Sequence, residues 1–219
     1  MARMARVVIP NYPHHVTQRG NRRQQTFFSE TDYQTYLNLL AKAKRKANIE
    51  VWAYCLMPNH VHLVVVPEHK DSLSAFFSDA HRRYARLIND REGWCGHLWQ
   101  ERFHSFVMDE RYLLTTVRYT ELNPVRAGLC DRPELWKWSS VHAHLKRKDD
   151  ALVNVNPMLQ RIGDWPKYLQ TSDSDSQLAT IRKHAKTGRP IGSKDFLSGL
   201  EQLTARSLSK GKPGPKSIK

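Results

Sequence analysis

The segment from residue 49 to residue 66 places the strongest constraint on the fold. Residues 49–56 and 60–66 are rich in β-branched and apolar side chains, and a Met-Pro-Asn turn separates them, so the segment predicts a β-hairpin. His60 and His62 lie two positions apart in the second strand and would point to the same side of it. Two neutral imidazoles a few ångströms apart can hold a divalent metal, although such a pair is equally compatible with ordinary surface.

A second informative run covers residues 118–124. If this run is helical, Tyr119 and Asn123 are four apart and share a face, so a phenol nucleophile and an amide oxygen could meet one metal. Each residue also has a structural interpretation, Tyr119 as a core aromatic and Asn123 as a helix end before Pro124. Glu121 is an alternative oxygen ligand, but it lies two residues from Tyr119 and would face away from it on a regular helix.

Hydrophobic periodicity predicts the other elements of the fold. We expect strands at residues 14–17 and 98–108, and helices at 71–90, at 110–121 and from a cap at Asp32 to about residue 48. The order strand, helix, strand, strand, helix, strand, helix is that of the split βαβ plan. The expected fold class is therefore α+β, a ferredoxin-like or RRM-like antiparallel sheet with helices on one face.

The charge of the chain favours a polyanionic partner. The 219 residues carry a formal net charge of +14 on an otherwise globular composition. Each phosphate that Lys or Arg neutralises releases counterions, so such an excess suits nucleic acid. We expect one domain over residues 1–148 and a basic, DNA-contacting extension over 149–219. Within the extension, short helices at 177–186 and 194–206 around a glycine-containing turn are compatible with a small DNA-reading unit, and residues 210–216 with a flexible tail.

Several features bear on the cellular compartment. The apolar runs are strand-sized, and the first six residues lack the apolar core of a signal peptide. Cys55, Cys95 and Cys130 are odd in number and irregularly spaced, which indicates reduced thiols and not a disulfide frame or a zinc site. We therefore expect a cytoplasmic, nucleoid-associated protein with no membrane partner.

Four separated motifs occur in a fixed order along the chain. They are Tyr-Pro-His-His-Val-Thr-Gln-Arg-Gly-Asn-Arg-Arg from residue 12, Met-Pro-Asn-His-Val-His from residue 57, Trp-Gln-Glu-Arg-Phe-His from residue 99, and Tyr-Thr-Glu-Leu-Asn-Pro-Val-Arg-Ala-Gly from residue 119. Over about residues 10–145 the chain resembles the tyrosine transposases of the HUH single-strand class, specifically the REP-associated tyrosine transposases. The Gly-Arg-Pro and Gly-Ser segment near residue 190, with its basic tail, also resembles the C-termini of this group.

The resemblance implies a particular reaction. Such proteins bind single-stranded DNA, often beside an imperfect hairpin, and a tyrosine attacks a backbone phosphorus to leave a 5′-phosphotyrosine link and a free 3′-hydroxyl. Carried over to this chain, Tyr119 is the nucleophile of a catalytic domain over residues 1–148, His60 and His62 are metal ligands, and Asn123 matches the third ligand. Some members of the wider class have glutamine at that third position. Two nitrogens and one oxygen with open positions suit Mg²⁺ or Mn²⁺.

DNA contacts are expected within the same motifs. The candidates for phosphate or base contacts are Arg19, Arg22, Arg23 and Arg102, with solvated surface charge as the alternative, and the candidates for base stacking are Trp94, Trp99 and His104. The expected function is a metal-dependent transposase or nickase that cleaves and rejoins single-stranded DNA carrying hairpin repeats, as a monomer or, alternatively, a dimer. Two other functions stay open: a sequence-specific hairpin-binding protein whose cleavage is secondary or lost, and an RNA-binding protein on the same fold.

Overall fold

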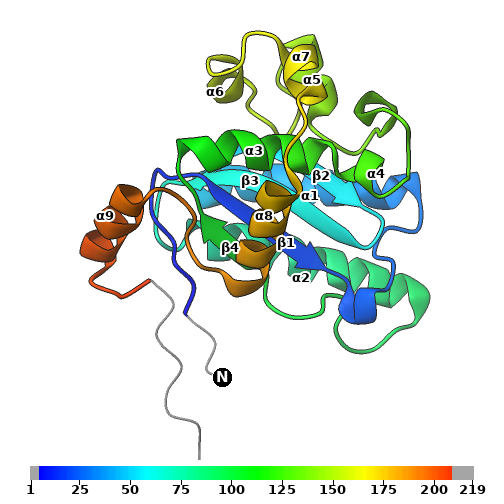
Figure 1. Ribbon diagram of the computed structural model, residues 1–219. Coiled ribbons are helices and arrows are strands. Elements are labelled where there is room, and N and C mark those ends of the chain that lie inside the picture. Colours follow the sequence, from blue (N-terminus) through cyan, green and yellow to red (C-terminus); the bar gives the residue numbers. More distant parts are fainter. Residues whose placement is uncertain (1–4, 209–219) are drawn as a thin grey trace, which may run out of the picture.

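A four-stranded antiparallel sheet forms the centre of the computed structural model, which describes residues 5–208 (Figure 1). The strands β1 (His14–Arg19), β2 (Ile49–Met57), β3 (His60–Pro67) and β4 (His104–Val107) lie in the order β2-β3-β1-β4. This is the order of the split βαβ plan, and it confirms the predicted α+β fold class. The hairpin predicted around the Met-Pro-Asn turn is the β2–β3 pair. The basic tail expected at residues 210–216 lies outside the described residues.

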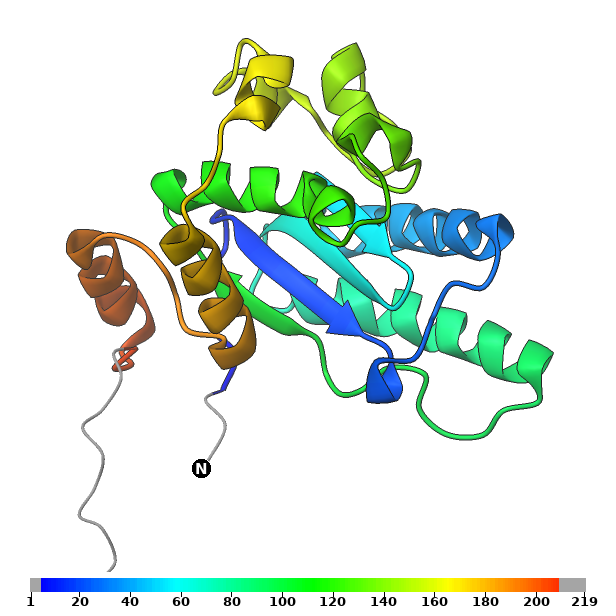
Figure 2. The ribbon, with the colours of Figure 1, turned by 45° about the vertical axis from the view of Figure 1, so that its right-hand side comes forward.

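Helices cover both faces of this sheet (Figures 1 and 2). On one face lie α1 (Glu30–Ala47) and α2 (Ser72–Glu92), which share a core with Leu63 of β3, and on the other lie α3 (Glu110–Glu121) and α8 (Asp175–Thr187). Because successive strand residues point to opposite faces, the odd positions of β3 enter the first core while its even positions face α3 and α8. Helices were expected on one face of the sheet, and α3 and α8 form a second helical layer that covers the other face.

The start of α1 differs from the predicted cap at Asp32. The helix begins at Glu30, and Ser29 is its N-cap. The Ser29 hydroxyl accepts a hydrogen bond from the Asp32 N–H at 3.3 Å, and the Asp32 carboxylate accepts one from the Ser29 N–H at 3.2 Å. Asp32 therefore completes a capping box from inside the helix, and so satisfies a backbone N–H that would otherwise lack a partner.

The last strand is shorter than the predicted 98–108. Residues ahead of β4 cross the end of β1, where the Gln100 N–H donates to the Arg19 carbonyl at 2.9 Å and the Asn21 N–H donates to the Leu98 carbonyl at 2.8 Å. This crossing directs the Trp99 ring inward, where it packs against α2 and is only 8% exposed. Trp99 is therefore a core residue, and the expectation that it could stack on DNA bases is wrong.

Beyond α3 the chain forms short helices, most of which lie along the outer side of α3 (Figures 1 and 2). These are α4 (Asn123–Arg126), the 3₁₀ turn η2 (Pro133–Leu135), α5 (Val141–Lys146), α6 (Asn156–Leu159) and α7 (Trp165–Gln170). The chain then returns to the sheet through α8 and ends its described part with α9 (Lys194–Thr204). The two predicted C-terminal helices thus exist. The boundary expected after residue 148 stays a prediction.

The segment between α8 and α9 docks on the free edge of β4. Ile191 forms a parallel bridge with Met108, and its N–H donates to the Val107 carbonyl at 3.0 Å. Asp109, the N-cap of α3, accepts hydrogen bonds from the N–H of Tyr112 on one oxygen and of Ser193 on the other. The turn therefore anchors α8 and α9 to the sheet. Whether this unit reads DNA stays a prediction.

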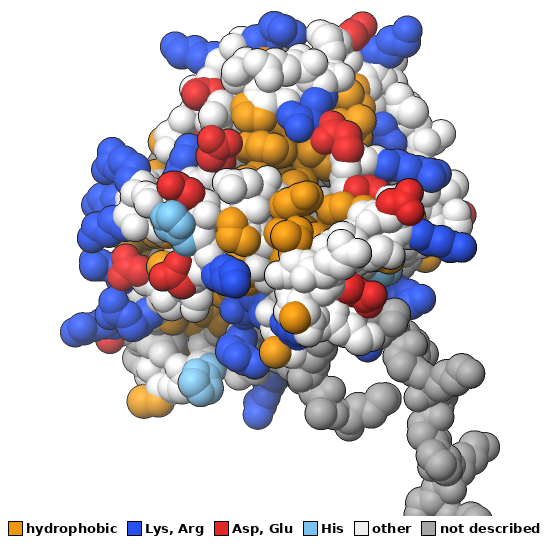
Figure 3. All heavy atoms as spheres, turned by 90° about the vertical axis from the view of Figure 1, so that its left-hand side faces the viewer, with side chains coloured by type: hydrophobic (Ala, Val, Ile, Leu, Met, Phe, Trp, Pro, Cys, Tyr) orange, Lys and Arg blue, Asp and Glu red, His pale blue; other side chains and the backbone are white. Residues whose placement is uncertain are grey.

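Charged side chains are unevenly distributed over the surface. Figure 3 shows one face of the molecule, on which Lys and Arg side chains crowd one edge and hydrophobic side chains gather between the charged groups. Over residues 5–208, the structure contains no helix long and apolar enough to cross a membrane.

Candidate active site

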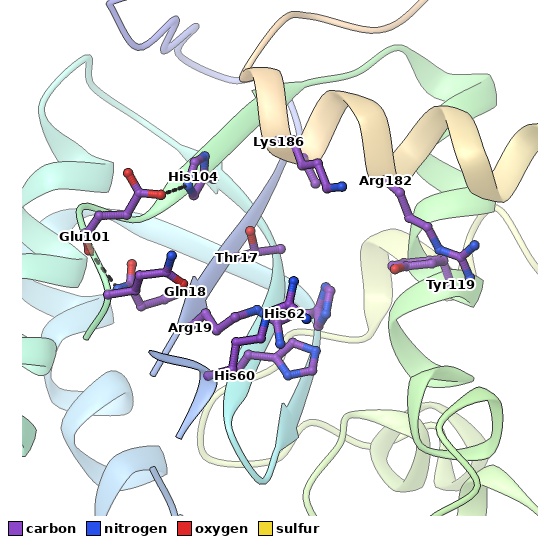
Figure 4. Close-up of a pocket in the computed structure, with 13 residues that line it drawn as sticks. Thr17, Gln18, Arg19, His60, His62, Glu101, His104, Tyr119, Arg182 and Lys186 are labelled. Carbon is purple, nitrogen blue, oxygen red and sulfur yellow. Dashed lines mark hydrogen bonds and ion pairs between the residues drawn. The ribbon is translucent and has the colours of Figure 1, made fainter. Parts of the chain in front are cut away.

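The register of β1 against β3 builds one polar face. Thr17 lies opposite His62, and Arg19 lies opposite His60. Since residues directly opposite in an antiparallel pair point to the same side, all four side chains project from the sheet face that α3 and α8 cover. They open into a pocket of about 500 Å³ (Figure 4). Its lining comprises Thr17, Gln18, Arg19, Arg23, His60, His62, Gln100, Glu101, His104, Tyr119, Arg182, Ala185 and Lys186.

The two strand histidines lie side by side, as the spacing predicts. The centroids of the His60 and His62 rings are 4.9 Å apart, with the rings at 70° to one another. Burial, with a smaller contribution from the nearby Arg19, lowers the pKa of His60 to about 3. Burial also holds the pKa of His62 well below its ordinary value, with a further contribution from His60. Both rings are therefore neutral at physiological pH, and each keeps one nitrogen lone pair.

The Nδ1 atom of each ring is in hydrogen-bond contact with a neighbouring polar atom. Nδ1 of His60 lies 2.6 Å from the Asn59 side-chain oxygen, and Nδ1 of His62 lies 3.0 Å from Nε2 of His15. The His15 and His62 rings are stacked with centroids 5.2 Å apart, and His15 is buried on β1. These contacts fix both ring orientations and leave Nε2 of His60 and of His62 as the atoms for a further ligand.

Tyr119 reaches the same pocket from α3. Its ring centroid lies 5.7 Å from that of His62 and 6.2 Å from that of His15, and the residue is 8% exposed. The guanidinium carbon of Arg126, on α4, lies 4.2 Å from the Tyr119 ring centroid, and Arg126 also donates to the Tyr119 carbonyl. The Arg182 side chain reaches from α8 to the Tyr119 phenol (Figure 4). Two guanidinium groups therefore lie next to Tyr119.

Asn123 is less directly placed. The helix breaks at Leu122, because Pro124 follows at the start of α4 and disfavours an unbroken helix through Asn123. Asn123 is buried, and its Nδ2 atom has no hydrogen-bond partner within residues 5–208. The pocket lining given above does not include Asn123 among the described residues. The structure thus brings His60, His62 and Tyr119 to one pocket and leaves Asn123 outside the described lining, with an unpartnered amide nitrogen.

Glu121, the alternative ligand, points into the short-helix lobe. It is fully buried and accepts hydrogen bonds from the Ser140 hydroxyl at 2.6 Å, from Trp165 Nε1 at 3.0 Å and from His144 Nδ1 at 2.7 Å. Three partners on one carboxylate indicate a structural joint between α3, α5 and α7. Glu121 therefore faces away from Tyr119, as the helical spacing predicts.

The predicted DNA contacts separate into two groups. Arg19 and Arg23 line the pocket, whereas Arg22 is exposed outside it and adopts a left-handed backbone with φ 52°. Arg102 is exposed and lines a second hollow beside β4. His104 borders both hollows, and its Nε2 lies 2.7 Å from the Glu101 carboxylate.

Four basic side chains of the site, those of His15, Arg126, Arg182 and Lys186, were not identified from the sequence. Adjacent histidines in a strand must face opposite sides, so one of residues 14 and 15 could have been placed on the site face. His14 points into the protein, where its Nε2 accepts the Ile9 N–H. The other residues are Arg126, Arg182 and Lys186. Arg126 lies in a motif quoted above, but the position of α8 depends on contacts that no local pattern reveals.

The donor set fits a divalent metal with nitrogen and oxygen ligands. The two imidazoles are neutral, and their Nε2 atoms are not used by Asn59 or His15. Asn123 would add an amide oxygen, although the atom of this buried amide that has no partner in the described chain is its Nδ2. Metal-binding histidines commonly donate the other ring N–H to an acceptor, which is the role open to Asn59 and His15 here. His60, His62 and Asn123 are therefore the residues that could hold such an ion.

Fold and site together have the features of a DNA-processing enzyme: a split βαβ sheet, a histidine pair on a central strand, and a helix-borne tyrosine in a cationic pocket. Comparison with known proteins gives the family. The sequence profile described as "Transposase IS200 like" matches residues 9–123, slightly more than half of the chain. The chain belongs to this transposase family.

Relatives of known name agree with this family. The chain is 26% identical over 128 residues to the REP-associated tyrosine transposase of Escherichia coli (strain K12), covering 58% of this chain and 74% of that protein. It is also 26% identical over 108 residues to a putative REP-associated tyrosine transposase of Haemophilus influenzae, covering 44% of this chain and 61% of that protein. Among solved structures, a REP-associated tyrosine transposase bound to a REP hairpin aligns with a TM-score of 0.55 at 25% identity, over 71% of this chain and 93% of that one.

Proposed function

We propose that this chain is a metal-dependent transposase that cleaves and rejoins single-stranded DNA at REP-like hairpins through a 5′-phosphotyrosine link on Tyr119. One observation carries the proposal. Tyr119 comes from helix α3 and the His60–His62 pair from the adjacent sheet, and they open into the same pocket. The Tyr119 and His62 ring centroids are 5.7 Å apart. A buried aromatic needs no such neighbours, whereas a nucleophile beside a metal site does.

The reaction balances with the groups of one site. The bond from Tyr119 Oη to phosphorus forms and the bond from phosphorus to the 3′-oxygen breaks. The phenol proton leaves to solvent, and the 3′-oxygen takes up a proton to become a hydroxyl. Attack of a 3′-hydroxyl on the phosphotyrosine reverses these steps and joins strands, so neither water nor a nucleotide cofactor is consumed.

The surrounding residues have defined tasks in this proposal. His62 binds metal through Nε2 only if Nδ1 carries the hydrogen, so Nδ1 donates to His15 Nε2, 3.0 Å away. His60 donates in the same way to Asn59. Mg²⁺ or Mn²⁺ held by His60, His62 and Asn123 would polarise a non-bridging phosphate oxygen and offset the charge that develops on the leaving 3′-oxygen. Arg126, packed on the Tyr119 ring, keeps the phenol in an electropositive setting.

The proposed substrate follows from charge and from the relatives. Arg19 and Arg23 put positive charge beside the histidine pair, which suits a DNA backbone. The related structure contains a REP hairpin, and we propose the same class of partner for this chain. Its physiological state is proposed to be monomeric and cytoplasmic, close to the nucleoid.

The test is an adduct assay on denaturing gels. Purified full-length protein is mixed with single-stranded oligonucleotides that carry the hairpin repeats flanking its own gene, with Mn²⁺, Mg²⁺ or chelator. A label at the 3′ end should migrate with the protein, and a label at the 5′ end should appear on a shorter free strand. This difference follows from a 5′-phosphotyrosine and would be reversed for a 3′ link.

Tyr119→Phe should bind the hairpin and form no adduct. The matched control is Tyr112→Phe, on the same helix but outside the pocket lining, which should form adduct as the unaltered protein does. Hairpin binding with no adduct from the unaltered protein, with metal present, would contradict the proposal and favour the hairpin-binding alternative. An adduct that persists in Tyr119→Phe would assign the nucleophile elsewhere.

A further inference from the structure

Helix α8 forms one wall of the pocket, although it lies beyond the 9–123 segment that matches the family profile. Arg182, Ala185 and Lys186 occupy successive turns of α8 and line the pocket together with Tyr119. Positions three and four apart on a helix share a face, so this set is one stripe of α8. Figure 4 shows Arg182 beside the Tyr119 phenol and Lys186 above Thr17 and His62.

This wall is held in place at both ends of the helix. Asp173, just before the helix, pairs with Arg118 of α3, and both side chains are largely buried, at 3% and 11% exposed. Ser174 and Gln177 then form a capping box at the N-terminus of the helix. After the helix, Ile191 joins the edge of β4. Ile181 is fully buried in the core that also contains Tyr119. The adjoining stripe of α8, which carries Arg182 and Lys186, therefore has a fixed position over the site.

The charges facing these cations favour an anionic ligand. Besides Arg182 and Lys186, the pocket lining carries Arg19 and Arg23, and Glu101 is the one acidic residue among its described members. Glu101 is already engaged by His104. Lys186 also borders the second hollow beside β4, which Arg102 lines. A row of cations thus leads from Tyr119 along α8 to Arg102.

We propose that α8 belongs to the active site, with Arg182 binding the phosphate that Tyr119 attacks and Lys186 binding the backbone as it leaves toward Arg102. The inference rests on the proposed function. It deepens that function by proposing the route that the DNA strand follows across the protein. Arg182 suits the reacting phosphate, because a guanidinium presents a planar pair of donors to phosphate oxygens and lies next to the phenol. Lys186 suits a passing phosphate, to which an ammonium acts as a point charge.

Measurements of DNA affinity and of reaction rate distinguish the roles of Arg182 and Lys186. The variants are Arg182→Gln, Arg182→Lys and Lys186→Gln, and the matched control is Lys183→Gln, an exposed residue of the same helix outside both hollows. Affinity for the uncleaved hairpin oligonucleotide is measured against salt concentration in a Tyr119→Phe background. The slope of log K against log salt should flatten by about 0.7 for Arg182→Gln and for Lys186→Gln, since each loses one phosphate contact on a single strand, and should stay unchanged for the control.

The single-turnover rate of adduct formation at saturating DNA tests the role in chemistry. Arg182→Gln should slow this rate by roughly 100-fold, the loss typical of one donor to developing charge, and Arg182→Lys should recover only part of it. Lys186→Gln should change the rate by less than about threefold, because its contact is the same before and during reaction. If Arg182 had only a structural role, Arg182→Gln would leave the salt slope unchanged, and Arg182→Lys would not recover part of the rate.

Two results would overturn the inference. The first is an Arg182→Gln protein with the salt slope and rate of the control, which would make the arginine ordinary surface. The second is an Arg182→Gln protein that reacts faster than the unaltered protein, which would mean that α8 obstructs the site. Failure of the unaltered protein to form any adduct would instead reject the proposed function, while the salt slopes would still decide whether α8 contacts the strand.

Discussion

Replacing Glu121 by Gln separates a structural joint from a metal ligand. The change keeps the size of the side chain, and its amide oxygen can take the place of the oxygen that accepts from Ser140 and His144. In the unaltered protein the Trp165 N–H donates to the other carboxylate oxygen at 3.0 Å. In the variant the amide nitrogen takes the place of that oxygen and faces the Trp165 N–H. Two donors meet in a fully buried setting, so one charge-assisted hydrogen bond is lost and the indole N–H lacks a partner.

These losses set the expected magnitude. A hydrogen bond to a charged group contributes about 1.5–3 kcal/mol, and a buried unpaired donor costs about 1–3 kcal/mol, so we expect a loss of about 3 kcal/mol in the free energy of unfolding. For a chain of this length each kcal/mol corresponds to about 2–4 °C, which predicts a fall in Tm of about 6–12 °C. Glu110→Gln on the same helix is the control. Its partner Arg161 is at the surface, so its Tm should hardly change.

Calorimetry completes the experiment. Titration of Mn²⁺ into Glu121→Gln, below its melting range, should give the affinity of the unaltered protein. Asn123→Ala should show the reverse pattern, a weakened Mn²⁺ affinity with a smaller change in Tm. A Glu121→Gln protein that melts normally and loses Mn²⁺ affinity would refute our interpretation of the joint and make Glu121 the oxygen ligand.

Two further predictions concern acid stability and a tight turn. Burial lowers the pKa of His14 from its ordinary 6.5 to about 4, so its contribution to stability is complete above pH 6.5 and is lost as the pH falls toward 4. Between pH 7 and 5 the fall in the free energy of unfolding, by urea titration at each pH, should therefore be smaller by about 2 kcal/mol in His14→Gln than in the unaltered protein. An identical pH dependence in that variant would contradict this account. Gly20→Ala should lower the free energy of unfolding by about 1–3 kcal/mol, because the new Cβ would lie 2.4 Å from the Gln24 carbonyl oxygen, whereas Gly163→Ala, with no heavy atom within 4 Å, should melt unchanged. Equal melting of the two alanine variants would show that the turn relaxes.

Local patterns were enough to predict the centre of the fold. The runs of β-branched and apolar residues in β2 and β3 and the turn between them predict a hairpin, and the parity of residues 60 and 62 puts both histidines on one face. The periodicity of α3 gave its bounds, 110–121, because Asp109 caps it at one end and Pro124 follows at the other. These features depend on neighbours within a few residues, which a sequence displays directly.

Other parts of the site depend on contacts between distant segments. Asp32 and Ser29 are both good caps, and only the geometry of the turn from Phe28 decides between them. The second helical layer also needed the structure, since α8 is positioned by Arg118 and by the edge of β4. Its amphipathic pattern indicates that one side is buried, but not against which part of the protein.

The central position of β1 has a consequence for the synthesis of this protein. β1 leaves the ribosome before the other three strands of this sheet, yet it lies between β3 and β4, so it must wait for residues 60–67 and then 104–107 before both its edges are paired. Pairing across such sequence separations is slow compared with local hairpin formation. The face that bears His15 and Arg19 is therefore among the last surfaces of the sheet to be completed. Tyr119 acquires its full set of surrounding cations only after residue 186 has been added, so the pocket is completed late in translation.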